Sequence, residues 1–269
     1  NTNADLKAAA CHNPTCTSAA ITTLDSTGNV GAFTSITIAN NGNPVISYYD
    51  ATNGDLNVAA CNSPTCLSAT LTTLDTAGNV GTSTSIVTGS NGNPVISYHD
   101  VTNGDLKLAV CDDSACTSAQ TVAVDTAGDV GEASSVTIGV NGNPIIAYYD
   151  ASDQDLKVAA CNNPTCAAVT RTSIDTGGNV GEYPSITIGD DGNPVISYYD
   201  DTNDDLKVAA CSNPTCTSAE ITTLDRPGTV GIHSSIVIGI GGKPAISYYD
   251  QTNIDLKMVA CGNTTCHNY

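Results

Sequence analysis

Short runs of alternating hydrophobic and polar residues fill the chain and are separated by Asn, Gly, Pro and Asp. Residues 33 to 82 contain four such runs: TSITIAN and VISYYD on either side of NGNP, then DLNVAAC and ATLTTLD on either side of a cysteine loop. This pattern, rich in β-branched and aromatic residues, predicts four short antiparallel strands. No segment has the apolar period of about 3.6 residues that marks an amphipathic helix, so we expect almost no helix.

The four runs return every 50 residues. Shifted by 50 positions, the chain aligns with itself from end to end without gaps, and its 269 residues make five periods with 19 residues left over. A fixed period of this size is typical of repeat architectures, and four strands per repeat are typical of a β-propeller blade. We therefore predict an all-β fold, a five-bladed β-propeller of 50-residue blades that forms a single domain over residues 1–269.

The repeat boundaries follow from the strand pattern. Residues 1–32 form half a blade with third and fourth strands, and residues 233–269 form a closing blade with first to third strands. The full blades are residues 33–82, 83–132, 133–182 and 183–232. We expect the ring to be closed by pairing of the N- and C-terminal strands, which leaves one third strand in surplus. Three roles are open for the tail, residues 251–269: covering an edge, replacing its N-terminal equivalent, or pairing with another subunit.

Turn residues support this interpretation. Asn41-Gly42 supplies the positive φ angles of a two-residue hairpin turn, and Pro44 stands at the first residue of the second strand, where its missing N–H does least harm. The glycine-rich GNVG is expected to join the outer strand of one blade to the inner strand of the next.

All 12 cysteines fall in six Cys-x4-Cys pairs. A hairpin loop of this length brings two Cβ atoms within disulfide range, and closing it contributes roughly 2 kcal/mol in the chain-entropy model. Zinc is the competing interpretation, but its knuckles converge with further Cys or His, and the four histidines stand at unrelated positions of the repeat. We predict one disulfide in each pair. The predicted disulfides join Cys11 with Cys16, Cys61 with Cys66, Cys111 with Cys116, Cys161 with Cys166, Cys211 with Cys216 and Cys261 with Cys266.

The disulfides predict an oxidising compartment, so we expect a secreted or extracellular protein at the cell surface. No apolar run is long enough to cross a membrane, and membrane insertion is not expected. The net charge of −19 disfavours nucleic acid and anionic membranes as partners, because both need basic patches.

Acidic residues recur on both sides of the link between the second and third strands, as in DATNGD at residues 50 to 55. Turn chemistry explains them, because Asp, Thr and Asn side chains bond nearby backbone N–H groups. The alternative is a calcium site in each blade, built from side-chain oxygens and backbone carbonyls, although the spacing is not that of an EF-hand. No other cofactor is expected. The candidate calcium ligands are Asp50, Asn53, Asp55, Asp100, Asn103, Asp105, Asp200, Asn203 and Asp205.

A catalytic centre needs an asymmetric set of residues, so it should depart from the repeat. The departures we identify are His99 in place of a tyrosine, the two arginines Arg171 and Arg226, Tyr183-Pro184, and Lys243 in a turn. They are scattered within the repeat and form no pair of nucleophile and base. We therefore expect no enzymatic activity and name no catalytic residue.

Residues 185–211, SITIGDDGNPVISYYDDTNDDLKVAAC, resemble the tandem β-propeller repeats of secreted and cell-surface bacterial and archaeal proteins. The resemblance covers the whole chain and implies surface display or adhesion. The turns also resemble the Asp-box of sialidase-like propellers, but the chain has no tryptophan to end that motif, and two arginines cannot supply a carboxylate-binding cluster.

Three functions are consistent with these features. The first is a structural or adhesive element of the cell exterior that self-assembles head to tail or by strand exchange into a filament or layer. The second is an adhesin or display module of a larger surface protein. The third is a lectin-like binder of cell-surface glycans with equivalent sites between blades. Its candidate ligand-binding residues are Tyr49, His99, Tyr149, Tyr199 and Tyr249.

Overall fold

The computed structural model describes residues 4–267, which form 21 β-strands and no helix. The first sheet has two strands, β1 (Leu6–Cys11) and β2 (Ala19–Asp25). Four sheets of four strands follow, and the first of them has β3 (Val30–Ile38), β4 (Pro44–Asp50), β5 (Asp55–Cys61) and β6 (Ala69–Asp75). The next has β7 (Val80–Thr88), β8 (Pro94–Asp100), β9 (Asp105–Cys111) and β10 (Ala119–Asp125), and it is followed by β11 (Val130–Ile138), β12 (Pro144–Asp150), β13 (Asp155–Cys161) and β14 (Val169–Asp175). The fourth has β15 (Val180–Ile188), β16 (Pro194–Asp200), β17 (Asp205–Cys211) and β18 (Ala219–Asp225). The last sheet has β19 (Val230–Ile238), β20 (Pro244–Asp250) and β21 (Asp255–Ala260).

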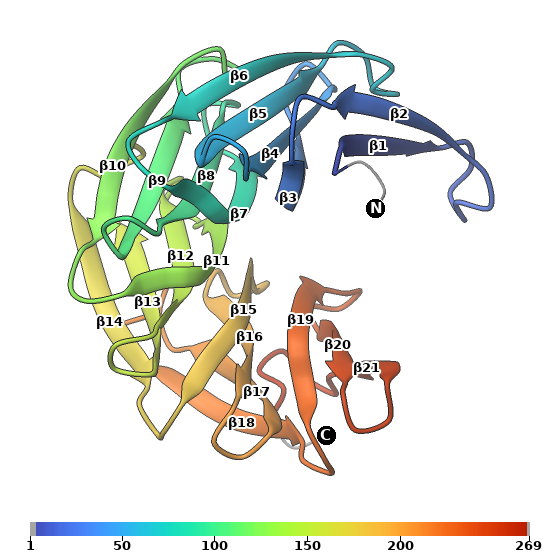
Figure 1. Cartoon of the computed structure of the whole chain (residues 1–269). Helices are drawn as coiled ribbons and strands as arrows, with labels where there is room; N and C mark the ends of the chain where they lie inside the picture. Colours follow the sequence, from blue (N-terminus) through green and yellow to red (C-terminus); the bar gives the residue numbers. More distant parts are fainter. Residues whose placement is uncertain (1–3, 268–269) are drawn as a thin grey trace.

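The repeated four-stranded antiparallel sheets confirm the predicted all-β fold. Each sheet after the first begins three residues before the predicted blade boundary, for example at Val30, because the first strand already starts inside the GNVG segment. Figure 1 shows the sheets fanned around a common centre, with β3, β7, β11, β15 and β19 innermost and the fourth strands outermost. No helix in the described part of the chain is long and apolar enough to span a membrane.

The core lies between successive sheets. Residues of the third strand of one sheet pack against the first strand of the next, so that Leu156 and Val158 are fully buried in one cluster with Val180 and Ile186. A close approach of backbones makes this packing possible. A Cβ atom added to Gly181 would lie 2.6 Å from the Cα of Leu156, so only glycine, here with φ of +100°, fits that position.

The predicted closure of the ring by pairing of its terminal strands is wrong. Strand β1 pairs with β2 and strand β21 with β20, and the two terminal sheets stay separate at the ends of an arc (Figure 1). The reason is that β1 already covers β3 and β4. Leu6 is buried in one cluster with Val30 and Ile46, which is the surface that β21 would need in a five-membered ring.

The hairpin turn between the first and second strands also differs from the prediction. Five residues, 39–43, separate β3 from β4, and only Gly42 has a positive φ angle, of 81°. The backbone N–H of Gly42 donates to the carbonyl of Ala39 at 2.9 Å, and the N–H of Asn43 donates to the Asn41 side chain at 2.9 Å. The loop is therefore longer than a two-residue turn, and Asn41 acts through its side chain.

All six predicted disulfides are present, with Cα–Cα distances of 4.7 to 4.9 Å. These bonds are compatible with an extracellular protein. The disulfides join Cys11 with Cys16, Cys61 with Cys66, Cys111 with Cys116, Cys161 with Cys166, Cys211 with Cys216 and Cys261 with Cys266.

The second cysteine of each pair has a backbone conformation that the sequence did not predict. Its φ angle is positive, between 48° and 58°, which is uncommon for a residue other than glycine. The left-handed residue lets the four-residue loop turn back so that the two cysteines meet. The residues with this conformation are Cys16, Cys66, Cys116, Cys166, Cys216 and Cys266.

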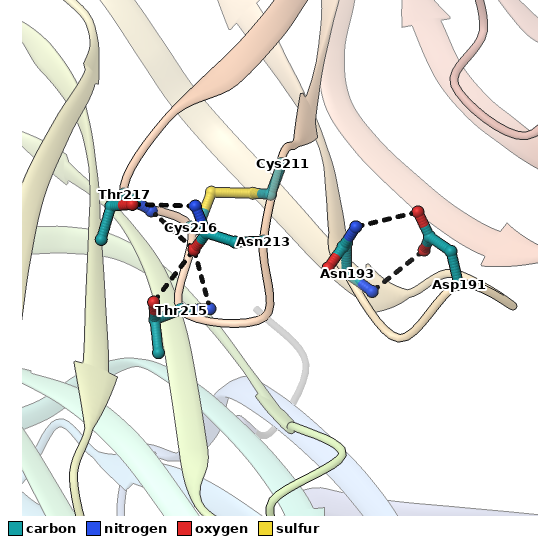
Figure 2. Close-up of a disulfide and its surroundings, with 7 residues drawn as sticks. All are labelled: Asp191, Asn193, Cys211, Asn213, Thr215, Cys216 and Thr217. Atoms are coloured by element: carbon teal, nitrogen blue, oxygen red, sulfur yellow. Dashed lines mark hydrogen bonds between the residues drawn. A yellow bond between two sulfur atoms is a disulfide. The ribbon is translucent and has the colours of Figure 1, made fainter.

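An asparagine holds the cysteine loop from inside, as Figure 2 shows for the loop between Cys211 and Cys216. The Asn213 side-chain oxygen accepts hydrogen bonds from the backbone N–H of Thr215 and of Thr217, both at 3.2 Å. The asparagine thus organises the loop that the disulfide closes.

Candidate functional site

A bulge interrupts each innermost strand near its start and turns one side chain toward the centre of the arc. The pairing of β3 with β4, for instance, shifts register between Ala32 and Ser35. Four residues at this bulge have positive φ angles of 50° to 53°. They are Phe33, Ser83, Tyr183 and His233. Such bulges commonly re-aim side chains next to functional sites.

A cavity of about 1070 Å³ opens where these bulges converge, and we call it the central cavity. All five innermost strands contribute to its lining, with Ala133 as the fifth bulge residue. Its volume is of the size that holds a small organic ligand. Apart from the bulge residues and several Ser and Thr hydroxyls, the acidic, histidine and tyrosine side chains in its lining are His99, Asp129, Glu132, Tyr149 and Glu182.

Carboxylates gather on one side of the central cavity. The chain has three glutamates, and two of them, Glu132 on β11 and Glu182 on β15, line it together with Asp129. Burial, followed by repulsion from Asp201 and Glu132, raises the pKa of Glu182, while its hydrogen bond to Asn179 lowers it. Glu182 therefore holds its proton to higher pH than an ordinary glutamate.

Asn179 organises the groups around Glu182. Its side-chain N–H donates to Asp201 Oδ2 at 2.9 Å and to Glu182 Oε1 at 3.5 Å, and its oxygen accepts from the hydroxyl of Tyr149 at 2.6 Å. Burial, followed by the charges of Glu182 and Glu132, raises the pKa of Tyr149 to about 12. The phenol is thus a neutral donor beside the carboxylates.

His99 faces Asp129 across the cavity wall. Its Nε2 lies 3.2 Å from Asp129 Oδ1, and its Nδ1 lies 3.5 Å from the hydroxyl of Thr82. The imidazole is 6% exposed, whereas the Asp129 side chain is 59% exposed. Elsewhere in the lining, the rings of Tyr183 and His233 meet edge to face with centroids 4.2 Å apart.

The structure brings together only part of the predicted ligand-binding set. His99 and Tyr149 line the central cavity, and the others do not. Tyr49 donates its hydroxyl to Asn79 Oδ1, and Tyr199 donates to Asp204 Oδ1, both at 2.6 Å. Tyr249 is half-buried on β20 in the last sheet.

The cysteines lie apart from the central cavity, and none of them lines it. Cys66 borders a smaller hollow of about 220 Å³ beside β1, together with Leu6 and Ile46. The other cysteines that close a loop border neither hollow, so the disulfides serve the fold of each repeat. These are Cys16, Cys116, Cys166, Cys216 and Cys266.

The candidate calcium ligands lie in turns. Asp50 Oδ1 accepts from the backbone N–H of Thr52 and of Asn53, and Asp50 Oδ2 accepts from the Asn53 side chain at 2.7 Å. The same Asn-to-Asp hydrogen bonds recur at Asp100 with Asn103 and at Asp200 with Asn203. Within residues 4–267, no three or more His, Cys, Asp or Glu side chains gather as a metal site.

The second acid of each candidate calcium set lies at the start of the next strand, and the pKa values of these acids are shifted in the same way. Burial raises the pKa of these carboxyl groups most, and repulsion from the aspartate across the turn adds to it, while Arg226 partly offsets the rise at the last of them. They are Asp55, Asp105 and Asp205. The repulsion between the two aspartates of each turn is compatible with a turn that is held by its hydrogen bonds alone.

The departures singled out from the sequence are divided by the structure. His99, Tyr183 and Pro184 line the central cavity, while Arg171 donates from Nε to the carbonyl of Val124 at 2.6 Å, away from it. Arg226 and Lys243 are not among its lining residues either.

Sequence reasoning missed Glu132 and Glu182. Their repeat position holds Ala32, Thr82, Glu132, Glu182 and Ile232 in the five copies, so both glutamates depart from the repeat in adjacent blades. A comparison of the copies at this one position would have found them.

No protein-family model matches the chain, and no curated protein matches it either. Solved structures do resemble its fold. A Hadza microbial sialidase has a TM-score of 0.62 at 12% identity, covering 90% of this chain and 57% of the sialidase. The GH93 α-L-arabinofuranosidase of Fusarium graminearum has a TM-score of 0.55 at 10% identity, covering 85% of this chain and 80% of that enzyme. A GH43 β-1,3-galactosidase has a TM-score of 0.54 at 11% identity, covering 86% of this chain and 56% of the galactosidase. The chain spans little more than half of the sialidase and galactosidase chains.

These likenesses correct two predictions. The chain was expected to be a structural, adhesive or lectin-like propeller without enzymatic activity, yet these solved structures that share its fold are glycoside hydrolases. The prediction considered each departure from the repeat by itself, and it did not compare Glu132 with Glu182 at their shared repeat position. At 10 to 12% identity the likeness shows the fold alone.

Proposed function

We propose that the chain is a glycoside hydrolase and that the central cavity is its active site. The observation that carries this proposal is the presence of Glu132 and Glu182 at one repeat position in adjacent sheets, both facing one cavity. Glycoside hydrolysis generally uses two carboxyl groups on either side of the scissile bond. The fold shared with glycoside hydrolases supports the same reaction class.

The two glutamates have different roles in this proposal. Glu182, whose pKa is raised by burial and neighbouring acids, acts as the general acid and gives its proton to the glycosidic oxygen as the bond to the anomeric carbon breaks. Glu132 supplies the carboxylate that stabilises the positive charge on the sugar ring. The oxygen of a water molecule then bonds to the anomeric carbon. One of the water protons stays on the new sugar hydroxyl, and the other goes to the Glu182 carboxylate, which restores the general acid.

Neighbouring side chains position the sugar. Tyr183 and His233 offer aromatic faces on which a pyranose or furanose ring stacks, and the hydroxyl oxygen of Tyr149, whose hydrogen is donated to Asn179, can accept a hydrogen bond from a sugar hydroxyl. The described lining of the cavity contains no arginine, which disfavours a substrate held through a carboxylate. We therefore propose a neutral glycoside as substrate.

The test is a panel of chromogenic glycosides incubated with the purified chain, including α-L-arabinofuranosides and β-galactosides. Hydrolysis that falls about 10²- to 10⁴-fold in Glu182→Gln and in Glu132→Gln is expected, as for the loss of general acid–base groups. Glu220→Gln, which changes the third glutamate on β18 outside the cavity, is the matched control and keeps full activity. Hydrolysis unaffected by either cavity variant, or none of any glycoside, would contradict the proposal.

We also propose that the enzyme is secreted and that its five repeats act as the five blades of one propeller. Six disulfides support an oxidising compartment. The convergence of the bulge residue of all five repeats on one cavity supports the blade count. Mass spectrometry of secreted protein with and without reduction tests the compartment through the mass added by thiol alkylation.

A further inference from the structure

A lysine bridges two buried aspartates between sheets in four of the repeats. Lys157 Nζ lies 2.9 Å from Asp125 Oδ2 and 3.1 Å from Asp150 Oδ2. Tyr148 donates its hydroxyl to the same Asp125 oxygen at 2.7 Å, and the ammonium lies 5.6 Å from the centre of its ring. The ammonium thus lies between two buried carboxylates and supplies positive charge to both, and at Asp125 the Arg171 guanidinium adds a second cation at 3.4 Å. The four lysines are Lys107, Lys157, Lys207 and Lys257.

The sheet β3–β6 keeps both aspartates and loses the lysine. Asp25 and Asp50 are 8% and 5% exposed, and Tyr48 donates its hydroxyl to Asp25 Oδ2 at 2.8 Å, as in the other repeats. The lysine position is occupied by Asn57, which pairs with Tyr48 across the strands just as Lys157 pairs with Tyr148. An asparagine is uncharged and too short to bridge the two carboxylates.

The side chain of Asn57 hydrogen-bonds Tyr48 but leaves its oxygen unsatisfied. The residue is 7% exposed, and its side-chain oxygen is buried without a hydrogen-bond partner. A buried carbonyl oxygen without a partner destabilises the folded state, and two buried carboxylates without a cation destabilise it further. Asp25, Asp50 and Asn57 stand at the repeat positions that in the next sheets are held by two aspartates and the lysine between them.

The oxygens in this position match the ligands of hard cations. Such ions prefer carboxylates, amide carbonyls and hydroxyls. The set holds only two acidic side chains, fewer than the three that define the acid and histidine clusters absent from residues 4–267. It shares Asp50 with the turn residues considered above, but Asn57 takes the place of Asn53, whose amide N–H donates to Asp50 Oδ2 at 2.7 Å.

We propose that the sheet β3–β6 binds a hard metal cation in place of the lysine ammonium, through Asp25 Oδ2, Asp50 Oδ2 and Asn57 Oδ1. The cation completes the charge balance that Lys107, Lys157, Lys207 and Lys257 provide elsewhere. The site is structural, because its residues are outside the central cavity. It is independent of the proposed glycosidase activity.

Thermal unfolding tests the site. The chelator-treated full chain is melted in choline chloride, and then with part of the choline replaced by CaCl2, MgCl2, NaCl or KCl at constant ionic strength. At a cation concentration about 100 times Kd, the unfolding equilibrium constant should fall about 100-fold, with a matching rise in Tm. Divalent and monovalent salts distinguish the two charge classes.

The chain offers its own matched variants. Asn57→Lys restores the residue of the other repeats, so it should fold, be more stable than the natural chain without metal, and lose the salt-specific rise in Tm. Lys207→Asn creates a second set from Asp175 and Asp200, and should lower Tm without metal and enlarge the rise with it. Isothermal titration should show binding to the natural chain and none to Asn57→Lys.

Two outcomes would overturn the proposal. One is an unchanged Tm in all four salts relative to choline chloride. The other is an equal rise in the natural chain and in Asn57→Lys, since the cation would then act elsewhere.

Discussion

Leu206 and Leu256 occupy the same position in successive repeats, yet Leu206 is fully buried and Leu256 is 84% exposed. Leu206 is covered by Val230 and the other inner residues of the last sheet. Leu256 has no following sheet to cover it, because β1 already occupies the equivalent surface on β3 and β4. The exposure of the leucine at this repeat position thus shows whether another sheet packs against its own.

Alanine substitution at these two positions should have unequal effects. Leu206→Ala is expected to lower the free energy of unfolding by about 2–5 kcal/mol, because it leaves a cavity in the core. Leu256→Ala should change it by less than about 0.5 kcal/mol, as is usual for an exposed site. Urea denaturation measures both. A large effect of Leu256→Ala would mean that the last sheet is covered in solution.

The tyrosine of each second strand stabilises the fold through its hydroxyl. Tyr198 is fully buried and donates to Asp175 Oδ2 at 2.7 Å, so Tyr198→Phe should cost about 1–3 kcal/mol by leaving a buried carboxylate with one donor fewer. The control is Tyr199→Phe, whose hydroxyl bonds to the exposed Asp204 and whose loss should cost less. Equal losses in urea denaturation would show that the buried hydrogen bond is not special.

Stability should fall at alkaline pH because of the same tyrosines. Burial and the neighbouring aspartates raise the pKa of Tyr98, Tyr148 and Tyr198 well above 10.0, and the aspartates raise the pKa of Lys157 and Lys207 despite burial. For a group with a raised folded pKa, stability is fully present below the unfolded pKa and is lost as pH rises through the folded value.

Thermal unfolding followed from about pH 7 to pH 12 should therefore show a Tm that starts to fall near pH 10, the ordinary tyrosine pKa. The buried tyrosines should ionise only when the chain unfolds, so their tyrosinate absorbance should appear at the same pH as unfolding. Early tyrosinate absorbance from all tyrosines in a folded chain would contradict the burial. Tyr198→Phe should show a shallower decline than the natural chain.

Glu182 should reduce stability at neutral pH. Burial and neighbouring acids raise its pKa in the folded chain above the ordinary glutamate value. The folded state is therefore favoured at low pH, where the carboxyl is protonated, and this stabilisation is lost as pH rises through the folded pKa. Glu182→Gln should therefore match the natural chain in Tm near pH 4 and exceed it near pH 7. At Glu220, whose side chain is 54% exposed, the change to Gln should give no such gain at neutral pH. A lower Tm of Glu182→Gln at neutral pH would mean that the carboxylate is stabilised.

Much of the local structure could be predicted from the sequence. Alternation in runs such as VISYYD and the proline at Pro44 indicate strands and their starts, since both depend on backbone preferences of neighbouring residues. The Cys-x4-Cys pairs indicated the disulfides, because a short loop allows few other partners for its cysteines. The repeat unit followed from identical patterns at a fixed spacing.

The candidate site could be predicted only in part. His99 was noticed because it replaces a tyrosine within one strand. Glu132 and Glu182 lie 50 positions apart, and nothing local shows that bulges aim both into one cavity. The pKa of Glu182 depends on burial and on Asp201, which approaches it only through the pairing of β15 with β16 and the turn that follows β16.

The sequence by itself determined the repeated four-stranded sheet and its disulfide, because these depend on contacts within 50 residues. Only the tertiary structure decided how the ends meet, since β1 and β21 have nearly the same sequence and compete for one surface on β3 and β4. The same holds for the cavity and for the asparagine among buried acids. The cavity and the buried asparagine both lie where separate sheets face each other, so the packing between sheets determines which side chains meet there.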